Sequence, residues 1–510
     1  MIWWTLAALV ALDYIYFKFR YTRKNGPPAW YGVPFVGFLP IFLLPKPLFG
    51  WAYSWLLNKT PNVFYTRVFG SWVVLKEEAI SEMQLNELCD SRPAHPLFDY
   101  VASSMANKKH WVFLDGGIPD TADWRDTRKV TLAALYRLSR QEIEDRVLDT
   151  VDSFLAEVEM HTGKEWDFSD ELVFSKVQEA LYFTVGQTID RKEIAPVVTA
   201  IGAYFKYLVV LTSLLQIVPI NIIHLLKYVI PKSLNPVVYC RVVSALVERL
   251  QQQRVRPENR RDAKDFIEAV MQVKSPEKAQ QLIRQVTPGI LVGSYHTTSQ
   301  TTALLVHYLA AYPDYQQRIF KEIKAIVGDG PPTLDHYEKM HFTKAFIAER
   351  YRMMPPVSFT IRITTAATTL GGYEIPAGTR LVALFHSETW NPKYFEHPEE
   401  FRPERHLNAK GIFVKSPHID VFSRGRRDCI GRHFAKISVI FYMIRLLQHF
   451  EVRRPKDKLI RFAKYDGSPV PSIPHQHVRF IRRDGAPPIR RVELDTTLLQ
   501  LINKCIKESS

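Results

Sequence analysis

A cysteine flanked by two glycines constrains this chain more than any other feature. Residues 422–431 read Phe-Ser-Arg-Gly-Arg-Arg-Asp-Cys-Ile-Gly, and an apolar, helix-forming run follows Gly431. Glycines let such a loop fold tightly and let a flat cofactor approach the backbone. Backbone N–H groups of the loop and a helix N-terminus can hold the charge of a thiolate at Cys429. Phe422 can shield that sulfur from water, and Arg427 can pair with a carboxylate of the cofactor.

These residues resemble the haem-binding signature of the cytochrome P450 family, Phe-x-x-Gly-x-Arg-x-Cys-x-Gly, and all five fixed positions match. The resemblance implies haem b as cofactor, with Cys429 as the axial thiolate ligand of the iron. A cysteine ligand pushes electron density toward the iron and favours O–O cleavage. The implied activity is therefore that of a haem-thiolate monooxygenase. From the residues alone, the alternative is a buried cysteine in a glycine-rich turn.

The pattern along the chain predicts a mainly α fold with a small β part. Residues 141–349 show helical periodicity, whereas residues 358–383 combine strand-forming side chains with turn signals. A second strand-rich piece follows Phe450. The length of 510 residues and the apolar fraction of 46% allow a large core with a buried cofactor. The resemblance implies the cytochrome P450 fold, with the haem between a long central helix and the cysteine loop.

Four segments are predicted. Residues 1–24 form an N-terminal membrane anchor with a basic flank, and residues 25–40 form a proline-rich hinge. The haem-thiolate catalytic domain follows over residues 41–482. Residues 483–510 are a C-terminal extension to which the sequence assigns no role.

The anchor is predicted from an apolar run, residues 2–17, that precedes Lys18, Arg20, Arg23 and Lys24. The positive-inside tendency places the rest of the chain in the cytosol. A single-pass anchor in the endoplasmic reticulum membrane is therefore expected. Asp13 interrupts the run, which is shorter than the roughly 20 apolar residues preferred for a crossing. A signal peptide is the alternative, but no small-residue cleavage site follows.

Glu349 and Arg352 are three residues apart, so on a helix they share a face. Alone, such a pair is usually a surface salt bridge. This pair stands just before two prolines and upstream of the cysteine loop, as the family pattern has it, and Arg405 matches a second family arginine. The resemblance implies that Glu349, Arg352 and Arg405 form a buried structural triad that supports folding and haem retention.

The family also implies a clamp for the haem propionates. Trp124 and Arg128 are one helical turn apart, so both can point at one propionate. Arg362 stands six residues after Pro356 on a predicted strand. For each arginine alone, exposure at the surface is the simpler interpretation. The predicted cofactor-binding set is Trp124, Arg128, Arg362, Phe422, Arg427 and Gly431.

Residues 293–299, Gly-Ser-Tyr-His-Thr-Thr-Ser, match the long helix that crosses the haem face in the family. Thr297 stands at the family's oxygen-side threonine, and His296 replaces an acid. An imidazole can relay protons with a different pKa from a carboxylate. Thr297 and His296 are therefore the predicted catalytic residues, the alternative for His296 being a hydrogen bond within a helical bend. Pro288 upstream predicts that this helix starts late or kinks.

The His-Thr pair and the arginine at position 362 also resemble the sterol 14α-demethylase branch, although a segment of that branch is missing from residues 96–117. His-Thr-Thr-Ser occurs in fungal secondary-metabolism members as well. The hypothesis is a hydrophobic substrate of the sterol or terpenoid class. By family analogy, its contacts fall near residues 96–117, 205–220 and 468–473.

The formal charge of +15, from 67 basic and 52 acidic residues, suits anionic lipid, an acidic protein or nucleic acid. We find no nucleic-acid motif, which favours membrane lipid and an acidic redox partner. The resemblance implies NADPH-cytochrome P450 reductase, with cytochrome b5 as a second candidate donor. The basic residues that flank the expected docking face are Arg125, Lys129, Arg426, Arg432 and Lys436.

Three other functions stay open. One is a fatty-acid or xenobiotic hydroxylase of the same family. Another is a peroxide isomerase or dehydratase that needs no reductase, which Thr297 disfavours because such members often lack that threonine. The last is a non-catalytic haem-binding protein.

Overall fold

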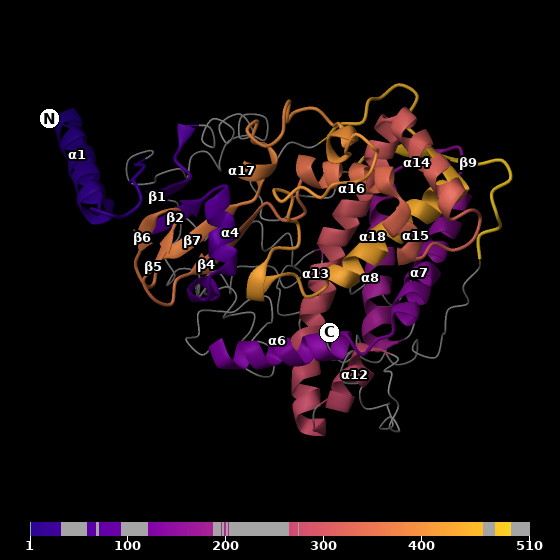
Figure 1. The fold of residues 1–510 in the computed structure, drawn as a ribbon, viewed down its shortest axis with the longest axis horizontal. Coiled ribbons are helices and arrows are strands. Elements are labelled where there is room, and N and C mark those ends of the chain that lie inside the picture. The colour runs from indigo at the N-terminus through magenta and orange to yellow at the C-terminus, as the bar shows by residue number, and fades with distance from the viewer. Residues whose placement is uncertain are drawn as a thin grey trace.

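The computed structural model describes residues 2–31, 59–67, 71–92, 121–186, 265–273, 275–462 and 475–490, with a few single residues between 195 and 202. Figure 1 shows two regions within these residues. Strands β1, β2 and β4 to β7 lie with the short helix α4 on one side, beside the N-terminal helix α1, and long helices pack together on the other side, where β9 also lies. The predicted mainly α fold with a small β part is confirmed.

The described helices are α1 (Ile2–Tyr21), α4 (Glu78–Leu85), η1 (Glu87–Cys89), α6 (Thr121–Leu135), α7 (Arg140–Met160), α8 (Ser169–Val185), α12 (Phe266–Val273), α13 (Pro276–Ala311), α14 (Pro313–Ile326), α15 (Leu334–Lys339), α16 (His341–Met353), α17 (His386–Thr389), η3 (Pro403–His406), η4 (Gly425–Arg427) and α18 (Arg432–His449). Their ends follow local chemistry. The Ser139 hydroxyl accepts from the Glu142 N–H at the start of α7. Gly186, with φ 74°, ends α8 in the left-handed conformation that favours glycine.

The described strands are β1 (Val63–Arg67), β2 (Ser71–Leu75), β3 (Glu165–Trp166), β4 (Phe359–Ile363), β5 (Thr368–Leu370), β6 (Tyr373–Ile375), β7 (Arg380–Leu384), β8 (Phe450–Arg453) and β9 (Val478–Arg482). They form a four-stranded sheet of order β1-β2-β7-β4, a three-stranded sheet β3-β9-β8 and the hairpin β5-β6. Only β2 and β7 run parallel among these pairs. The predicted strand region thus supplies β4 to β7, and the piece after Phe450 supplies β8.

The core lies where α7, α8, α13 and α18 pack on one another. Val147 of α7, Leu305 of α13 and Ile444 of α18 are fully buried within it. Burying such side chains stabilises the fold by about 1.5–3 kcal/mol each before chain entropy is subtracted. A rigid central helix, α13, results, and one end of α18 leads directly into the cysteine loop.

Helix α13 begins at Pro276 and continues through Pro288 to Ala311, so of the two effects predicted for Pro288, a late start or a kink, the late start is wrong. Pro276 occupies the first helical position, where a missing N–H costs nothing. Hydroxyls along α13 donate back to carbonyls one turn earlier, as from Ser294 to Ile290 at 2.8 Å and from Thr302 to Thr298 at 2.9 Å. Such bonds satisfy buried hydroxyls without leaving the helix.

Helix α1 has one face against the body and one exposed apolar face. Phe17 is 1% exposed and packs on the rings of Tyr21 and Tyr31. On the other face Leu12 and Phe19 are exposed. No helix within the described ranges meets the length and hydropathy needed to cross a membrane.

The first part of the predicted hinge joins the sheet. Trp30 donates to the Tyr65 carbonyl at 2.8 Å, and Tyr65 donates to the Pro28 carbonyl at 2.9 Å. The rest of the hinge lies outside the described residues, as do the predicted substrate segments and residues 491–510 of the extension.

Candidate functional site

The cysteine loop is a closed turn at the start of α18. The Cys429 N–H donates to the Phe422 carbonyl at 2.7 Å, which closes the loop around η4. Gly425 has φ +71°, and a Cβ added there would lie 2.1 Å from the Gln84 carbonyl oxygen of α4. Only glycine therefore lets the loop press against α4.

Cys429 is an exposed residue whose thiol is nevertheless partly removed from water. The residue is exposed, yet packed protein atoms desolvate the thiol and raise its pKa. The Gly431 N–H, which donates to the sulfur, opposes that rise, as do Arg432 and Arg128. Backbone N–H donation therefore acts against the effect of burial. A bound metal cation would act in the same direction as that donation, because a coordinating thiol is deprotonated outright.

Trp124 and Arg427 form a buried stack beside the loop. The Arg427 guanidinium lies 3.4 Å from the centre of the Trp124 ring, and its Nε donates to the Asp90 carbonyl at 2.7 Å. Trp124 is 2% exposed, and its indole N–H has no acceptor within the described part of the chain. A buried donor without an acceptor is costly, so this N–H fits a ligand carboxylate.

The other two predicted clamp arginines are placed differently. Arg128 donates to the Asp428 carbonyl at 2.8 Å and pairs with the Asp428 carboxylate, so it braces the cysteine loop instead of joining Trp124. Arg362 is 3% exposed on β4 and donates to Thr360 Oγ1 and to the Ile361 carbonyl, each at 2.8 Å.

Glu349, Arg352 and Arg405 lie together in a buried cluster. Arg352 forms a bidentate pair with the Glu349 carboxylate at 2.8 and 2.9 Å, and Arg405 Nε donates to it at 3.0 Å. His406 Nε2 lies 2.8 Å from the same carboxylate, and the Arg402 N–H donates to it at 2.9 Å. These hydrogen bonds outweigh burial and lower the pKa of Glu349 to about 2. The sequence reasoning missed His406, although it directly follows Arg405.

The predicted catalytic pair lies on α13. Thr297 is half-buried, and its hydroxyl donates to the Gly293 carbonyl at 2.6 Å. That bond leaves the oxygen free to accept a further hydrogen bond. His296 is also half-buried, and its ring centre lies 6.2 Å from that of Tyr295.

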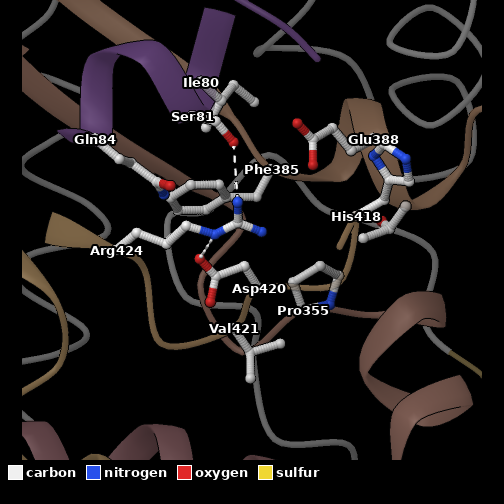
Figure 2. Close-up of a pocket in the computed structure, with 11 residues that line it drawn as sticks. Ile80, Ser81, Gln84, Pro355, Phe385, Glu388, His418, Asp420, Val421 and Arg424 are labelled. Carbon is white, nitrogen blue, oxygen red and sulfur yellow. Dashed lines mark hydrogen bonds and ion pairs between the residues drawn. The ribbon is translucent and has the colours of Figure 1, made fainter. Parts of the chain in front are cut away.

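A small polar cavity lies between α4, α17 and residues 417–424 (Figure 2). Its Arg424 guanidinium donates to Asp420 at 2.9 Å, and burial raises the pKa of Glu388 to about 8. The cavity offers about 20 Å³ to the centre of a water molecule. That space suits a bound water, and it is too small for an organic substrate.

The described residues fit a haem. Cys429 is an exposed residue whose thiolate can bind the haem iron. The buried Trp124 N–H, which has no acceptor among the described residues, and the buried Arg427 suit the carboxylates of the haem. A Cβ added to Gly431 would meet no atom within 4 Å, so the loop leaves room for a flat group.

Comparison with known proteins gives the same family. The model for cytochrome P450 matches residues 27–477. Cytochrome P450 2J2 of Homo sapiens is 23% identical over 498 residues, which cover 92% of this chain and 94% of that protein. Cytochrome P450 2L1 of Panulirus argus is 29% identical over 232 residues, 44% of this chain and 47% of the relative.

A bacterial relative is cyclooctat-9-en-7-ol 5-monooxygenase of Streptomyces melanosporofaciens, 29% identical over 197 residues, 38% of this chain and 43% of the relative. The family match covers most of the sequence, and the helical body, small sheets and closed cysteine loop agree with it. The chain belongs to the cytochrome P450 family of monooxygenases, oxidoreductases that use a haem iron with an axial cysteine thiolate.

Proposed function

We propose that this chain inserts one oxygen atom from O2 into a hydrophobic substrate, with Cys429 as the axial haem ligand. The observation that carries the proposal is the exposed residue Cys429 in a loop closed by the bond from its own N–H to Phe422. When bound, the haem supplies the iron chemistry that activates O2.

The remaining roles belong to side chains of this chain. Trp124 and Arg427 would hold a propionate, because the buried Trp124 indole N–H has no acceptor within the described residues and the Arg427 cation stacks on the same ring. Thr297 and His296 would accept and donate protons from α13, and Phe422 would shield the sulfur. Glu349, Arg352 and Arg405 hold η3 against α16. They would thereby support folding and haem retention.

The test is the carbon monoxide difference spectrum of the reduced protein. Cys429→Ala should abolish the band typical of a thiolate-ligated haem, since no other sulfur is placed at the loop. Cys89→Ala is the matched control, because Cys89 is 1% exposed and burial raises the pKa of its thiol to about 12. That control should keep the band. A band that survives in Cys429→Ala would contradict the assignment.

We further propose a sterol or terpenoid substrate. The support is the His-Thr pair of α13 together with the Streptomyces melanosporofaciens relative, whose name gives an unsaturated alcohol as substrate. Titration of the loaded protein with sterols should shift the Soret band with saturation at micromolar concentrations. A shift with fatty acids alone would favour the fatty-acid hydroxylase instead.

We propose electron delivery from NADPH-cytochrome P450 reductase, with cytochrome b5 as a second donor, at the endoplasmic reticulum membrane. The exposed cations Arg125, Lys129, Arg426 and Lys436 near the cysteine loop support an acidic partner. The exposed apolar face of α1 and the basic residues at its end support contact with lipid.

A further inference from the structure

Asp90 is a buried acid that belongs to none of the motifs above. It follows η1 and is 4% exposed. The next residue, Ser91, accepts from the Ile363 N–H at 2.9 Å and pairs with it as an antiparallel bridge. The Thr365 N–H donates to the Leu88 carbonyl at 2.8 Å. Backbone bonds therefore fix Asp90 beside the end of β4, the strand that carries Arg362.

Arginines surround this carboxyl group. Arg427 Nε donates to the Asp90 backbone carbonyl at 2.7 Å, and Arg426 Nη1 lies 3.9 Å from the Asp90 carboxylate. Arg362 and Arg125 also act on it electrostatically. Four arginines therefore lie near the single Asp90 carboxylate, so the positive charge close to the Trp124–Arg427 stack exceeds the negative charge of Asp90.

The Asp90 carboxylate does not have the contacts of a purely structural acid. Within the described part of the chain its Oδ2 is buried and makes no hydrogen bond. Glu349, by contrast, satisfies both carboxylate oxygens. Burial raises the pKa of Asp90, and Arg427, Arg426, Arg362 and Arg125 oppose that rise. A charge held in this way has its main effect through the field that it adds to its surroundings.

We propose that Asp90 is a positioning residue of the haem site whose negative charge competes with a haem propionate for the arginines around it. The inference rests on the proposed function, because it takes Trp124 and Arg427 as propionate ligands. A fixed negative charge beside the haem disfavours reduction of the iron, and it weakens the hold of the arginines on the propionate. Asp90 therefore lowers both the reduction potential and the affinity for haem.

The test uses the full-length, haem-loaded protein with Asp90→Asn, which keeps the shape of the side chain and removes its charge. The reduction potential should become more positive, and transfer of haem to apomyoglobin should slow several-fold. Asp90→Glu keeps the charge and should retain a potential close to wild type. Glu87→Gln is the matched control, because Glu87 lies on the same segment and pairs with Arg426 but is exposed.

A potential that stays at the wild-type value in Asp90→Asn, or equal shifts in Asp90→Asn and Glu87→Gln, would overturn the proposal. Faster haem loss with an unchanged potential would mark Asp90 as structural only and overturn it too. Failure of the proposed function is seen separately, as a wild-type protein without the thiolate-haem spectrum.

Discussion

His296 stands directly before Thr297 on α13, where the imidazole can both accept and donate a proton. If His296 acts as the proposed proton relay, replacing it with alanine removes the relay and leaves the hydroxyl of Thr297 in place. We expect His296→Ala to release several-fold more hydrogen peroxide per NADPH oxidised, since proton delivery no longer keeps pace with electron delivery. The measurement is peroxide yield with the reductase, and it needs no identified substrate.

Tyr295→Phe is the control for this variant, because burial raises the pKa of Tyr295 to about 12 and its hydroxyl does not titrate near neutral pH. His296→Asp should restore coupling, since a carboxylate can also relay protons. Equal peroxide yields for His296→Ala and wild type would remove His296 from the mechanism.

At the residue scale, sequence motifs predicted which residues belong to the site better than they predicted which residues contact one another. Cys429, Glu349 and Arg352 could be named because each stands at a fixed spacing within one segment. The pairing of Arg128 with Asp428 could not, because it joins α6 to a loop 300 residues later. Asp90 carried no signal at all, since only the docking of η1 on β4 brings it to the arginines.

At the scale of elements, the buried Lys176 side chain of α8 contacts Ser438 and Tyr442 of α18. Lys176 Nζ lies 3.3 Å from Glu179, 2.5 Å from Ser438 Oγ and 3.1 Å from the centre of the Tyr442 ring. Burial lowers the pKa of Lys176 to about 8. Between that value and the unfolded pKa of about 10.4, the unfolded chain binds more protons, so stability rises with pH.

We therefore expect Lys176→Met to remove about 1–3 kcal/mol of this pH-dependent gain. The measurement is thermal unfolding at pH 7.5 and pH 10. The wild-type protein should be more stable at pH 10 by this amount, and the variant should lack the difference. Lys176→Met/Glu179→Gln avoids leaving Glu179 uncompensated and should show the same flattening. Lys393→Met, at an exposed lysine, should behave as wild type. A wild-type pH dependence that persists in Lys176→Met would contradict the assignment.

Element types were predictable where periodicity was long and strong, as in α7 and α13. The start of α13 was not, because tertiary packing carries the helix through Pro288 despite its missing N–H. The strands of residues 358–383 were predicted as a group. Their parallel partner β2 was not, since its pairing with β7 joins segments about 300 residues apart.

At the scale of the whole molecule, part of the excess of basic residues lies exposed near the cysteine loop. Lys436 at the start of α18 is exposed, and Lys415 and Arg432 raise the positive potential around it. We expect Lys436→Glu to raise the apparent KM for the reductase several-fold, with the effect shrinking as salt screens the charges. Lys321→Glu on α14 is the control, because it makes the same charge change on an exposed helix outside the loop. Identical KM values for the two variants would argue against docking at this face.

Within the described residues, the Glu349 carboxylate is held by four groups of the polypeptide itself: Arg352, Arg405, His406 and the Arg402 N–H. The cluster can therefore close on a newly made chain before any prosthetic group arrives. Haem insertion would then come onto a scaffold that is already assembled.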